Sequence, residues 1–295
     1  MKLLSVVTSK GTSLAAKLPS GVLVFSEANE LRGNATLLPP TLGAAITGEG
    51  GLERWLPLLQ TVTDHAGAEK FTVPEASVKI AMPFMPGNVF CVGLNYRDHA
   101  AESNSPIPQQ PVLFAKWTSA MIGHGQPIVI PPDTQEVDYE AELGVVVGKK
   151  CRGVSAQDAL DYVAGYVCVN DISARDFQRG DGQWVRAKSQ DSFGPFGPFL
   201  VTPDEVPEPQ NLGIRCSVNG RMLQNSNTRE MIFSVRELIA FISRGITLHA
   251  GDVISTGTPP GVGFAQKPPL FLHPGDEVVV EIDGVGRLSN PVKAM

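Results

Sequence analysis

The stretch Val137–Gly148 has the sequence VDYEAELGVVVG, in which acidic and other residues alternate before a short apolar run. The alternation predicts one strand whose side chains point to opposite faces in turn, so that Asp138, Glu140 and Glu142 share a face. Three carboxylates crowded on one side of a strand that enters a core repel each other unless a cation neutralises them. A hard, oxygen-binding metal ion would do so, whereas a solvated edge strand with acidic outward residues is the alternative.

Another predicted strand runs into a carboxylate further along the chain. Val167–Val169 is followed by Asn170 and Asp171, so Asp171 could complete the same metal site. If the next residues, ISARDFQ, are helical, Arg175 and Gln178 lie one and two turns beyond Asp171 and line one edge of a pocket. An ordinary turn with a surface arginine is the alternative.

His99 and Glu102 are three residues apart in the segment LNYRDHAAE, which places them on one face of a helix. A glutamate behind a histidine fixes the tautomer of the ring and raises its basicity, as a general base requires. None of the other four histidines has such a partner in the sequence. A chance pair on an exposed helix is the alternative.

The segment Gly251–Gly263, GDVISTGTPPGVG, predicts a strand that enters a stiff loop with free hydroxyl and backbone N–H groups. Such a loop suits a carboxylate or phosphate oxygen of a small substrate. It lacks the lysine of a P-loop and the spacing of a dinucleotide fingerprint, so the segment does not indicate ATP or NAD as a ligand.

Composition narrows the class of protein. The 295 residues are 42% hydrophobic and carry a net charge of −6, which excludes disorder as the main state and makes nucleic acid an unsuitable partner. No apolar run approaches the length of a membrane span, and the first residues lack a signal-peptide core, so we expect a soluble protein of the cytoplasm, with the mitochondrion as the alternative. The four cysteines show no metal-binding spacing and are predicted to be buried thiols.

The 30 glycines and 24 prolines favour many short strands joined by turns. We predict a mixed α+β, mainly β fold with a small N-terminal domain and linker over residues 1–80 and a larger domain over 81–295. Hairpin turns are expected at Asn219-Gly220 and Asp283-Gly284. Capping boxes predict two helices, one beginning at Ser155 and one at Ser234.

Five motifs taken together, VGLNYRDHAAE, VDYEAELGVVVGK, NDISARDFQ, KSQDSFGPFGP and GDVISTGTPPGVG, resemble the fumarylacetoacetate hydrolase family in this order over residues 88–295. The C-terminal residues are most similar to the branch that contains the short fumarylacetoacetate hydrolase domain-containing proteins and their bacterial relatives. The resemblance implies a β-roll catalytic domain, usually a homodimer.

The resemblance also implies a site. Glu140, Glu142 and Asp171 would hold Mg²⁺ or Mn²⁺, with Ca²⁺ as a further option. Val92 stands where some longer members have a fourth acidic ligand, so waters would complete the coordination. The family's catalytic residues fall on His99, Glu102 and Lys188, and its substrate-orienting residues on Arg175, Gln178 and Thr258. Ala187 and Ser189 flank the lysine where the family more often has Gly and Phe.

Such a site suits a small 2-oxo acid that binds the metal through its carboxylate and keto oxygens. The predicted activity is hydrolysis of a C–C bond in an acylpyruvate or related β-diketo acid, with His99 activating water and the metal stabilising the enolate. Decarboxylation or tautomerisation of oxaloacetate, or isomerisation of a hydroxymuconate-like acid, is the alternative on the same chemistry. A catalytically silent 2-oxo-acid-binding protein is the rival of another class.

Overall fold

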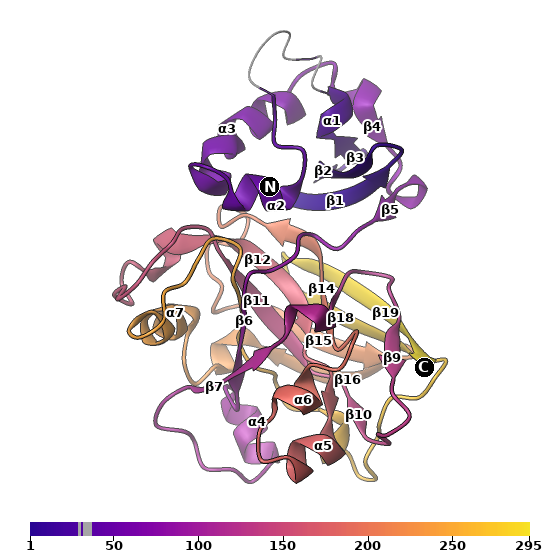
Figure 1. The fold of residues 1–295 in the computed structure, drawn as a ribbon, viewed down its shortest axis with the longest axis vertical. Coiled ribbons are helices and arrows are strands. Elements are labelled where there is room, and N and C mark those ends of the chain that lie inside the picture. Colours follow the sequence, from indigo (N-terminus) through magenta and orange to yellow (C-terminus); the bar gives the residue numbers. More distant parts are fainter. Residues whose placement is uncertain (29–30, 32–36) are drawn as a thin grey trace.

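The fold is that of a computed structural model, which describes residues 1–28, 31 and 37–295. It is mainly β with mixed sheets, as predicted (Figure 1). The N-terminal part forms the upper body in Figure 1, where its described residues form short α-helices and strands of the large sheet. Its elements are β1 (Lys2–Thr8), β2 (Gly11–Leu18), β3 (Gly21–Val24), α1 (Phe25–Ala28), α2 (Leu42–Thr47), α3 (Gly51–Thr63), β4 (Thr72–Val73) and β5 (Lys79–Ile80).

The larger part carries most of the strands and all the residues of the predicted site. Short helices α4, α5 and α6 lie at its end away from the N-terminal strands (Figure 1). Its helices are α4 (Arg97–Glu102), α5 (Arg175–Gly180), α6 (Val185–Lys188) and α7 (Val235–Ser243). Its strands are β6 (Val89–Gly93), β7 (Val112–Lys116), β8 (Met121–Ile122), β9 (Ile128–Ile130), β10 (Val137–Asp138), β11 (Ala141–Val147), β12 (Val163–Asn170), β13 (Ser173–Ala174), β14 (Gly194–Val201), β15 (Gly213–Val218), β16 (Arg221–Asn227), β17 (Val253–Ser255), β18 (Glu277–Ile282) and β19 (Gly286–Ala294).

One sheet runs through both parts of the molecule. Its order is β4-β3-β2-β1-β14-β12-β11-β17-β6-β7, and a second sheet has the order β16-β15-β18-β19-β9. The N-terminal strands join the larger part where β1 pairs with β14. The domain boundary near residue 80 stays a prediction, and the chain passes there from β5 to β6.

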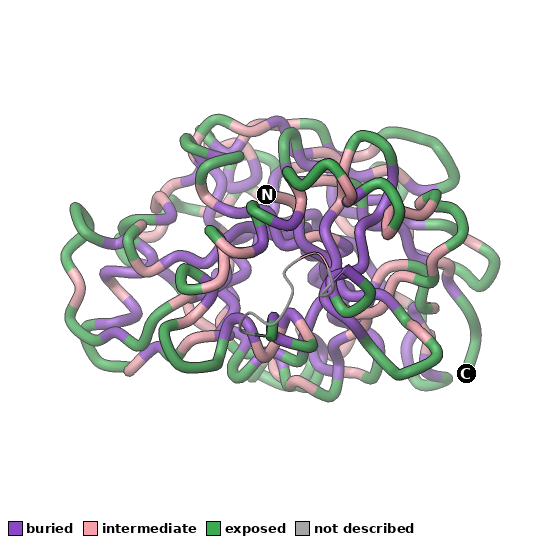
Figure 2. The backbone as a smooth tube through the Cα atoms, turned by 90° about the horizontal axis from the view of Figure 1, so that it is seen from above, coloured by how far each residue is buried: buried purple, intermediate pink, exposed green. Residues whose placement is uncertain are grey.

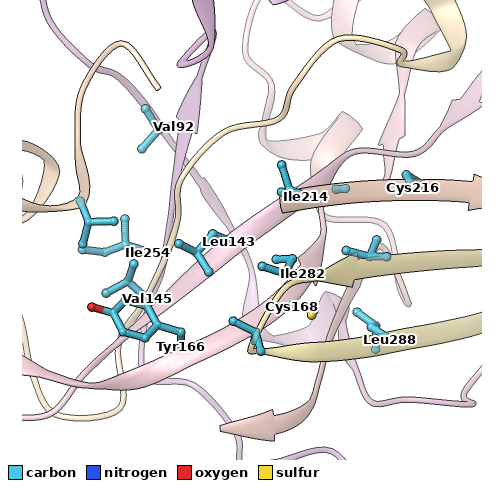
Figure 3. Close-up of a cluster of buried hydrophobic side chains, with 14 of the residues drawn as sticks. Val92, Leu143, Val145, Tyr166, Cys168, Ile214, Cys216, Ile254, Ile282 and Leu288 are labelled. Atoms are coloured by element: carbon cyan, nitrogen blue, oxygen red, sulfur yellow. The ribbon is translucent and has the colours of Figure 1, made fainter. Parts of the chain in front are cut away.

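Strands β11 and β12 are buried on both faces, because each face packs on a different apolar core. Leu143 and Val145 point to a core that also contains Ile214, Ile282 and Leu288 (Figure 3). Val146 points the opposite way, to a core that it shares with the N-terminal strands and helices. The sheet therefore has an interior on both sides, and buried segments lie inside a rim of exposed loops (Figure 2).

Local turn and capping signals are largely confirmed. The Asn219-Gly220 turn joins β15 to β16 with both residues at positive φ, and the Asp283-Gly284 turn joins β18 to β19. The capping box of Ser234 with Glu237 begins α7. The helix predicted at Ser155 is wrong: only a single 3₁₀ turn, Ala159–Tyr162, follows, although Ser155 does bond Asp158.

The single strand expected over Val137–Leu143 is also wrong. The strand is interrupted at Tyr139 and Glu140. Before the interruption β10 pairs with β13 in a two-stranded ribbon, and after it β11 pairs with β12 in the large sheet. None of the described helices combines the length and the apolar character that crossing a membrane requires.

Candidate active site

The three carboxylates predicted as metal ligands come together. Ala141 is paired with Asn170 in the β11–β12 ladder, so Glu140, just before β11, lies beside Asp171, just after β12. The backbone N–H of Asp171 donates to the carbonyl oxygen of Glu140 across 2.9 Å. Oxygen atoms of Glu140, Glu142 and Asp171 all lie within 4.8 Å of one another, and the three residues are buried.

Glu140 is neutralised by two cations. Its carboxylate accepts hydrogen bonds from Lys188 Nζ at 2.7 Å and from an Arg175 Nη at 2.5 Å. Burial alone would raise the pKa of Glu140, but Lys188 and Arg175 outweigh burial and hold it below its ordinary value. The two cations therefore favour the ionised form of Glu140 inside the protein.

Glu142 has a different environment. Its Oε2 accepts from Ser255 Oγ at 2.5 Å and from the backbone N–H of Gly257 at 2.9 Å, and within the described part of the chain it forms no ion pair. Burial raises its pKa well above the ordinary value, and the charges of Asp171 and Glu140 raise it further. Glu142 is the member of the cluster that lacks a cation.

Asp171 lies between two lysines. Lys188 Nζ donates to one carboxylate oxygen at 2.8 Å and Lys116 Nζ to the other at 2.6 Å. Burial lowers the pKa of Lys116, and contact with Asp171 opposes that shift. Lys116 is not among the residues predicted from the sequence. The available signal was a charged residue in the otherwise apolar strand VLFAK.

Asp138 does not share the face of the cluster, contrary to expectation. Its carboxylate accepts from Arg175 Nε at 2.8 Å and from the backbone N–H groups of Gly263 at 2.6 Å and Phe264 at 3.1 Å. The break after β10 turns Asp138 away from Glu142 and toward α5. Asp138 therefore orients Arg175.

Arg175 and Gln178 do meet, but not by the predicted route. The helix begins at Arg175, so no helical turn separates Arg175 from Asp171, and residues 173–174 form β13. Arg175 donates to Gln178 Oε1 across 2.9 Å. The ladder of β10 with β13, rather than a helix, brings this segment to the carboxylates.

The predicted pair on α4 is present. His99 Nδ1 and Glu102 Oε2 lie 3.0 Å apart. The other oxygen of Glu102 accepts from the backbone N–H of Gly261 at 2.9 Å. His99 is buried and its ring packs edge-on near Phe264. His99 is thus an interior residue, and the more exposed Glu102 is held by two bonds, to His99 and to Gly261, so this is not a chance pair on a free helix face.

The Gly/Pro loop after β17 was expected to grip an anionic substrate through its N–H groups. Three of these groups instead bind carboxylates of the protein: Gly257 binds Glu142, Gly261 binds Glu102, and Gly263 binds Asp138. Thr258 donates to the carbonyl oxygen of Ala141 at 3.0 Å and accepts from Gln224 at 2.8 Å. The loop organises the site from behind.

A cavity of about 350 Å³ opens onto this cluster. Glu102 and Asp171 do not line the cavity, but each bonds a residue that does: Glu102 bonds His99, and Asp171 bonds Lys188. Phe114 and Trp184 pack edge-on with ring centroids 5.4 Å apart and form part of an apolar wall. The predicted site residues that line the cavity are His99, Glu140, Glu142, Arg175, Gln178, Lys188 and Thr258.

The donor set fits a hard divalent cation. Four buried carboxylates, those of Asp138 and the three cluster residues, face three buried cations, those of Lys116, Arg175 and Lys188. The excess of negative charge falls at Glu142, and the ligand atoms available are all oxygen, as Mg²⁺, Mn²⁺ and Ca²⁺ prefer.

A mainly β fold that gathers a carboxylate triad, a His–Glu pair and basic side chains around one cavity has the architecture of an enzyme for small molecules. The family model for the fumarylacetoacetate (FAA) hydrolase C-terminal domain matches residues 88–293, and the chain belongs to this family.

Individual relatives extend the comparison. The chain is 46% identical to the oxaloacetate tautomerase fahd2, mitochondrial, of Xenopus laevis over 82% of this chain and 76% of the relative. Among solved structures, fumarylacetoacetate hydrolase from Exiguobacterium antarcticum superposes with a TM-score of 0.83 at 35% identity, covering 100% of both chains. The 2-hydroxyhepta-2,4-diene-1,7-dioate isomerase from Mycobacterium marinum superposes with a TM-score of 0.75 at 32% identity, covering 100% of this chain and 98% of that one.

The frog relative is named as mitochondrial, so the compartment of the present chain, for which the cytoplasm was expected, stays a prediction.

Proposed function

We propose that this protein is a divalent-metal-dependent enzyme that interconverts the keto and enol forms of a 2-oxo dicarboxylic acid, with oxaloacetate as the substrate. One observation carries the proposal: His99, paired with Glu102, lines the same cavity as Lys188 and two members of the carboxylate triad, Glu140 and Glu142. A base for a carbon-bound proton and a cationic environment for an enolate are the two requirements of enolisation.

Glu140, Glu142 and Asp171 would hold the metal. When bound, it would polarise the 2-keto group and offset the negative charge that enolisation places on that oxygen. Sequence identity supports oxaloacetate as the substrate, because the Xenopus laevis relative with 46% identity is named as an oxaloacetate tautomerase.

His99 would move the proton. A carboxylate only accepts hydrogen bonds, so in the neutral ring the proton would lie on Nδ1, toward Glu102, and the lone pair of Nε2 would face the substrate. Nε2 would remove a proton from C3 of the keto acid and deliver it to the 2-oxygen, which gives the enol; in the reverse direction the proton would pass from the enol hydroxyl back to C3. Because Gly261 holds the second oxygen of Glu102, the ring keeps one orientation through the transfer.

Basic and polar side chains would hold the substrate. Lys188 packs 5.1 Å from the ring centre of Phe114 and points its ammonium at the carboxylate cluster, where it would stabilise the charge on the 2-oxygen. Arg175 and Gln178 would bind a substrate carboxylate. Thr258 keeps one lone pair free to accept a hydrogen bond from the enol hydroxyl.

Isomerisation of a 2-hydroxy-diene dicarboxylic acid is a second candidate. It is favoured by the apolar wall of Phe114 and Trp184, beside which a hydrocarbon segment longer than that of oxaloacetate could lie. The Mycobacterium marinum structure is named for this activity. Hydrolysis of an acylpyruvate, the main prediction from the sequence, has less support, because it needs an ordered water in addition to the same residues.

The test is a substrate panel with purified protein, Mg²⁺ and a chelator control. Ketonisation of enol-oxaloacetate should be accelerated with Mg²⁺, lost with chelator, and lost in Glu142→Gln. The panel includes oxaloacetate for release of carbon dioxide, a 2-hydroxy-diene dicarboxylate for double-bond migration and an acylpyruvate for cleavage. Faster turnover of either of the last two would replace the proposed substrate. No turnover of any, together with tight binding of a 2-oxo acid, would favour the silent binding protein.

A further inference from the structure

Lys116 is a buried lysine at the back of the carboxylate cluster. Its side chain is fully buried, and its ammonium donates to Asp171 Oδ1 at 2.6 Å and to the carbonyl oxygen of Ile172 at 3.0 Å. We propose that Lys116 is a positioning residue for the metal: it fixes Asp171 so that Oδ2 is presented to the ion. This inference rests on the proposed metal site.

Stability alone does not explain a lysine at this position. Taking an ammonium out of water costs several kcal/mol, and an apolar side chain of similar length is often as good or better for stability. The neighbours of Lys116, Ala115 and Trp117, are both exposed, so the strand turns its one charged side chain inward. A lysine aimed into the interior, with its proton donors on one carboxylate and one carbonyl, serves those two acceptors.

The two lysines on Asp171 have different surroundings. Lys188 lines the cavity and bridges Asp171 Oδ2 with Glu140, so it lies on the side from which an ion and a substrate would enter. Lys116 is not among the cavity residues and binds the opposite oxygen. Lys188 therefore lies on the cavity side of Asp171, and Lys116 fixes the Asp171 carboxylate from the side away from the cavity.

The bond to Ile172 strengthens this assignment. Lys116 holds both the side chain of Asp171 and the backbone of the next residue, so it fixes the strand end that carries the ligand. Outer partners of metal ligands act in this way, and their removal typically weakens metal affinity by about 10- to 100-fold.

The test compares Lys116→Met with Lys188→Met by calorimetric titration of Mn²⁺, without substrate. The same substitution is made on either oxygen of Asp171. We expect Mn²⁺ affinity to fall by about 10- to 100-fold in Lys116→Met. Affinity should not fall in Lys188→Met, because Lys188 occupies the oxygens that an ion would use. If loss of positive charge governs binding, both variants will bind Mn²⁺ more tightly, and that result would overturn the proposal.

Lys116→Gln provides the second arm, because it removes the charge but can still donate to Asp171. A positioning role predicts an affinity between those of the wild type and Lys116→Met. Equal weakening in Lys116→Gln and Lys116→Met would also overturn it, as would wild-type affinity in Lys116→Met. If Lys116→Met does not fold, the Mn²⁺ affinities of Lys116→Gln and Lys188→Gln are compared instead. Weaker binding in Lys116→Gln than in Lys188→Gln supports the proposal, and equal or tighter binding overturns it. If the wild type binds no Mn²⁺, the metal-dependent function fails, and this inference fails with it.

Discussion

The backbone N–H of Gly261 donates to Oε1 of Glu102 across 2.9 Å, although the two residues are 159 positions apart. Oε2 of the same carboxylate holds His99 at 3.0 Å. The loop after β17 thus determines how the histidine on α4 is oriented. Gly261 can do this because its φ of 101° belongs to the region that favours glycine.

Gly261→Ala should impair the orientation of His99 without weakening metal binding. The new Cβ would collide with the backbone carbonyl of Leu223 and force the loop to move. We expect a loss of about 1–3 kcal/mol of stability from backbone strain, a lower kcat and an Mn²⁺ affinity close to wild type. The control is Gly275→Ala, at a φ of 99° with nothing near the added Cβ. Equal kcat values in the two variants would contradict the predicted link.

Removal of the base should slow two reactions of oxaloacetate to different extents. His99→Ala should slow tautomerisation of oxaloacetate by about 10²- to 10⁴-fold, the usual contribution of a general base. Decarboxylation should suffer less, because loss of carbon dioxide needs an electron sink at the 2-keto oxygen and no base at C3. Glu102→Gln should act in the same direction but more mildly. Both rates are measured at saturating Mg²⁺, and equal losses in His99→Ala would rule out this division of roles.

Two neighbouring glutamates should have opposite effects on stability. Glu140→Gln leaves Lys188 and Arg175 without a buried counter-charge and should cost about 3–5 kcal/mol. Glu142→Gln removes a charge that has no cation, while the amide oxygen can still accept from Ser255 and Gly257, so the chelated protein should be as stable as wild type or more so. Urea unfolding with chelator measures both. A similar loss in the two variants would show that Glu142 is also paired in solution.

The raised pKa of Glu142 makes metal-free stability fall as pH rises. Above about 4.3 an unfolded glutamate loses its proton, whereas the folded protein retains it up to the raised pKa. The folded state gains stability by binding this proton, and that gain is lost as pH rises from about 4.3 to the raised pKa of folded Glu142. Over this pH range the free energy of unfolding of the wild type should therefore fall relative to that of Glu142→Gln. Urea unfolding in chelator over a pH series tests this. Since an ion needs the ionised carboxylate, Mg²⁺ affinity should rise over the same range.

Homodimerisation is predicted from the family resemblance alone. Light scattering of the purified protein at micromolar concentration should report twice the mass of the 31.5 kDa chain. A monomer at that concentration would contradict the prediction.

Local patterns in the sequence predicted much of the site. The spacing of two residues brought Glu140 to Glu142, although the strand predicted through them is interrupted, and Asp171 directly after a strand supplied the third carboxylate. The i, i+3 spacing put His99 beside Glu102. These relationships depend on the periods of strands and helices, which a sequence displays directly.

Tertiary structure alone decided what surrounds those residues. The strand is interrupted after Asp138 because β10 and β11 join different sheets. No local signal in the sequence shows which ladder each strand joins. The pairing of Lys116 with Asp171 joins residues 55 apart, and that of Gly257 with Glu142 joins residues 115 apart. Such contacts depend on strand order and register, and these depend on the packing of both cores together. The sequence alone therefore determined which groups are candidates for the site, and the fold decided their charge, their orientation and their partners.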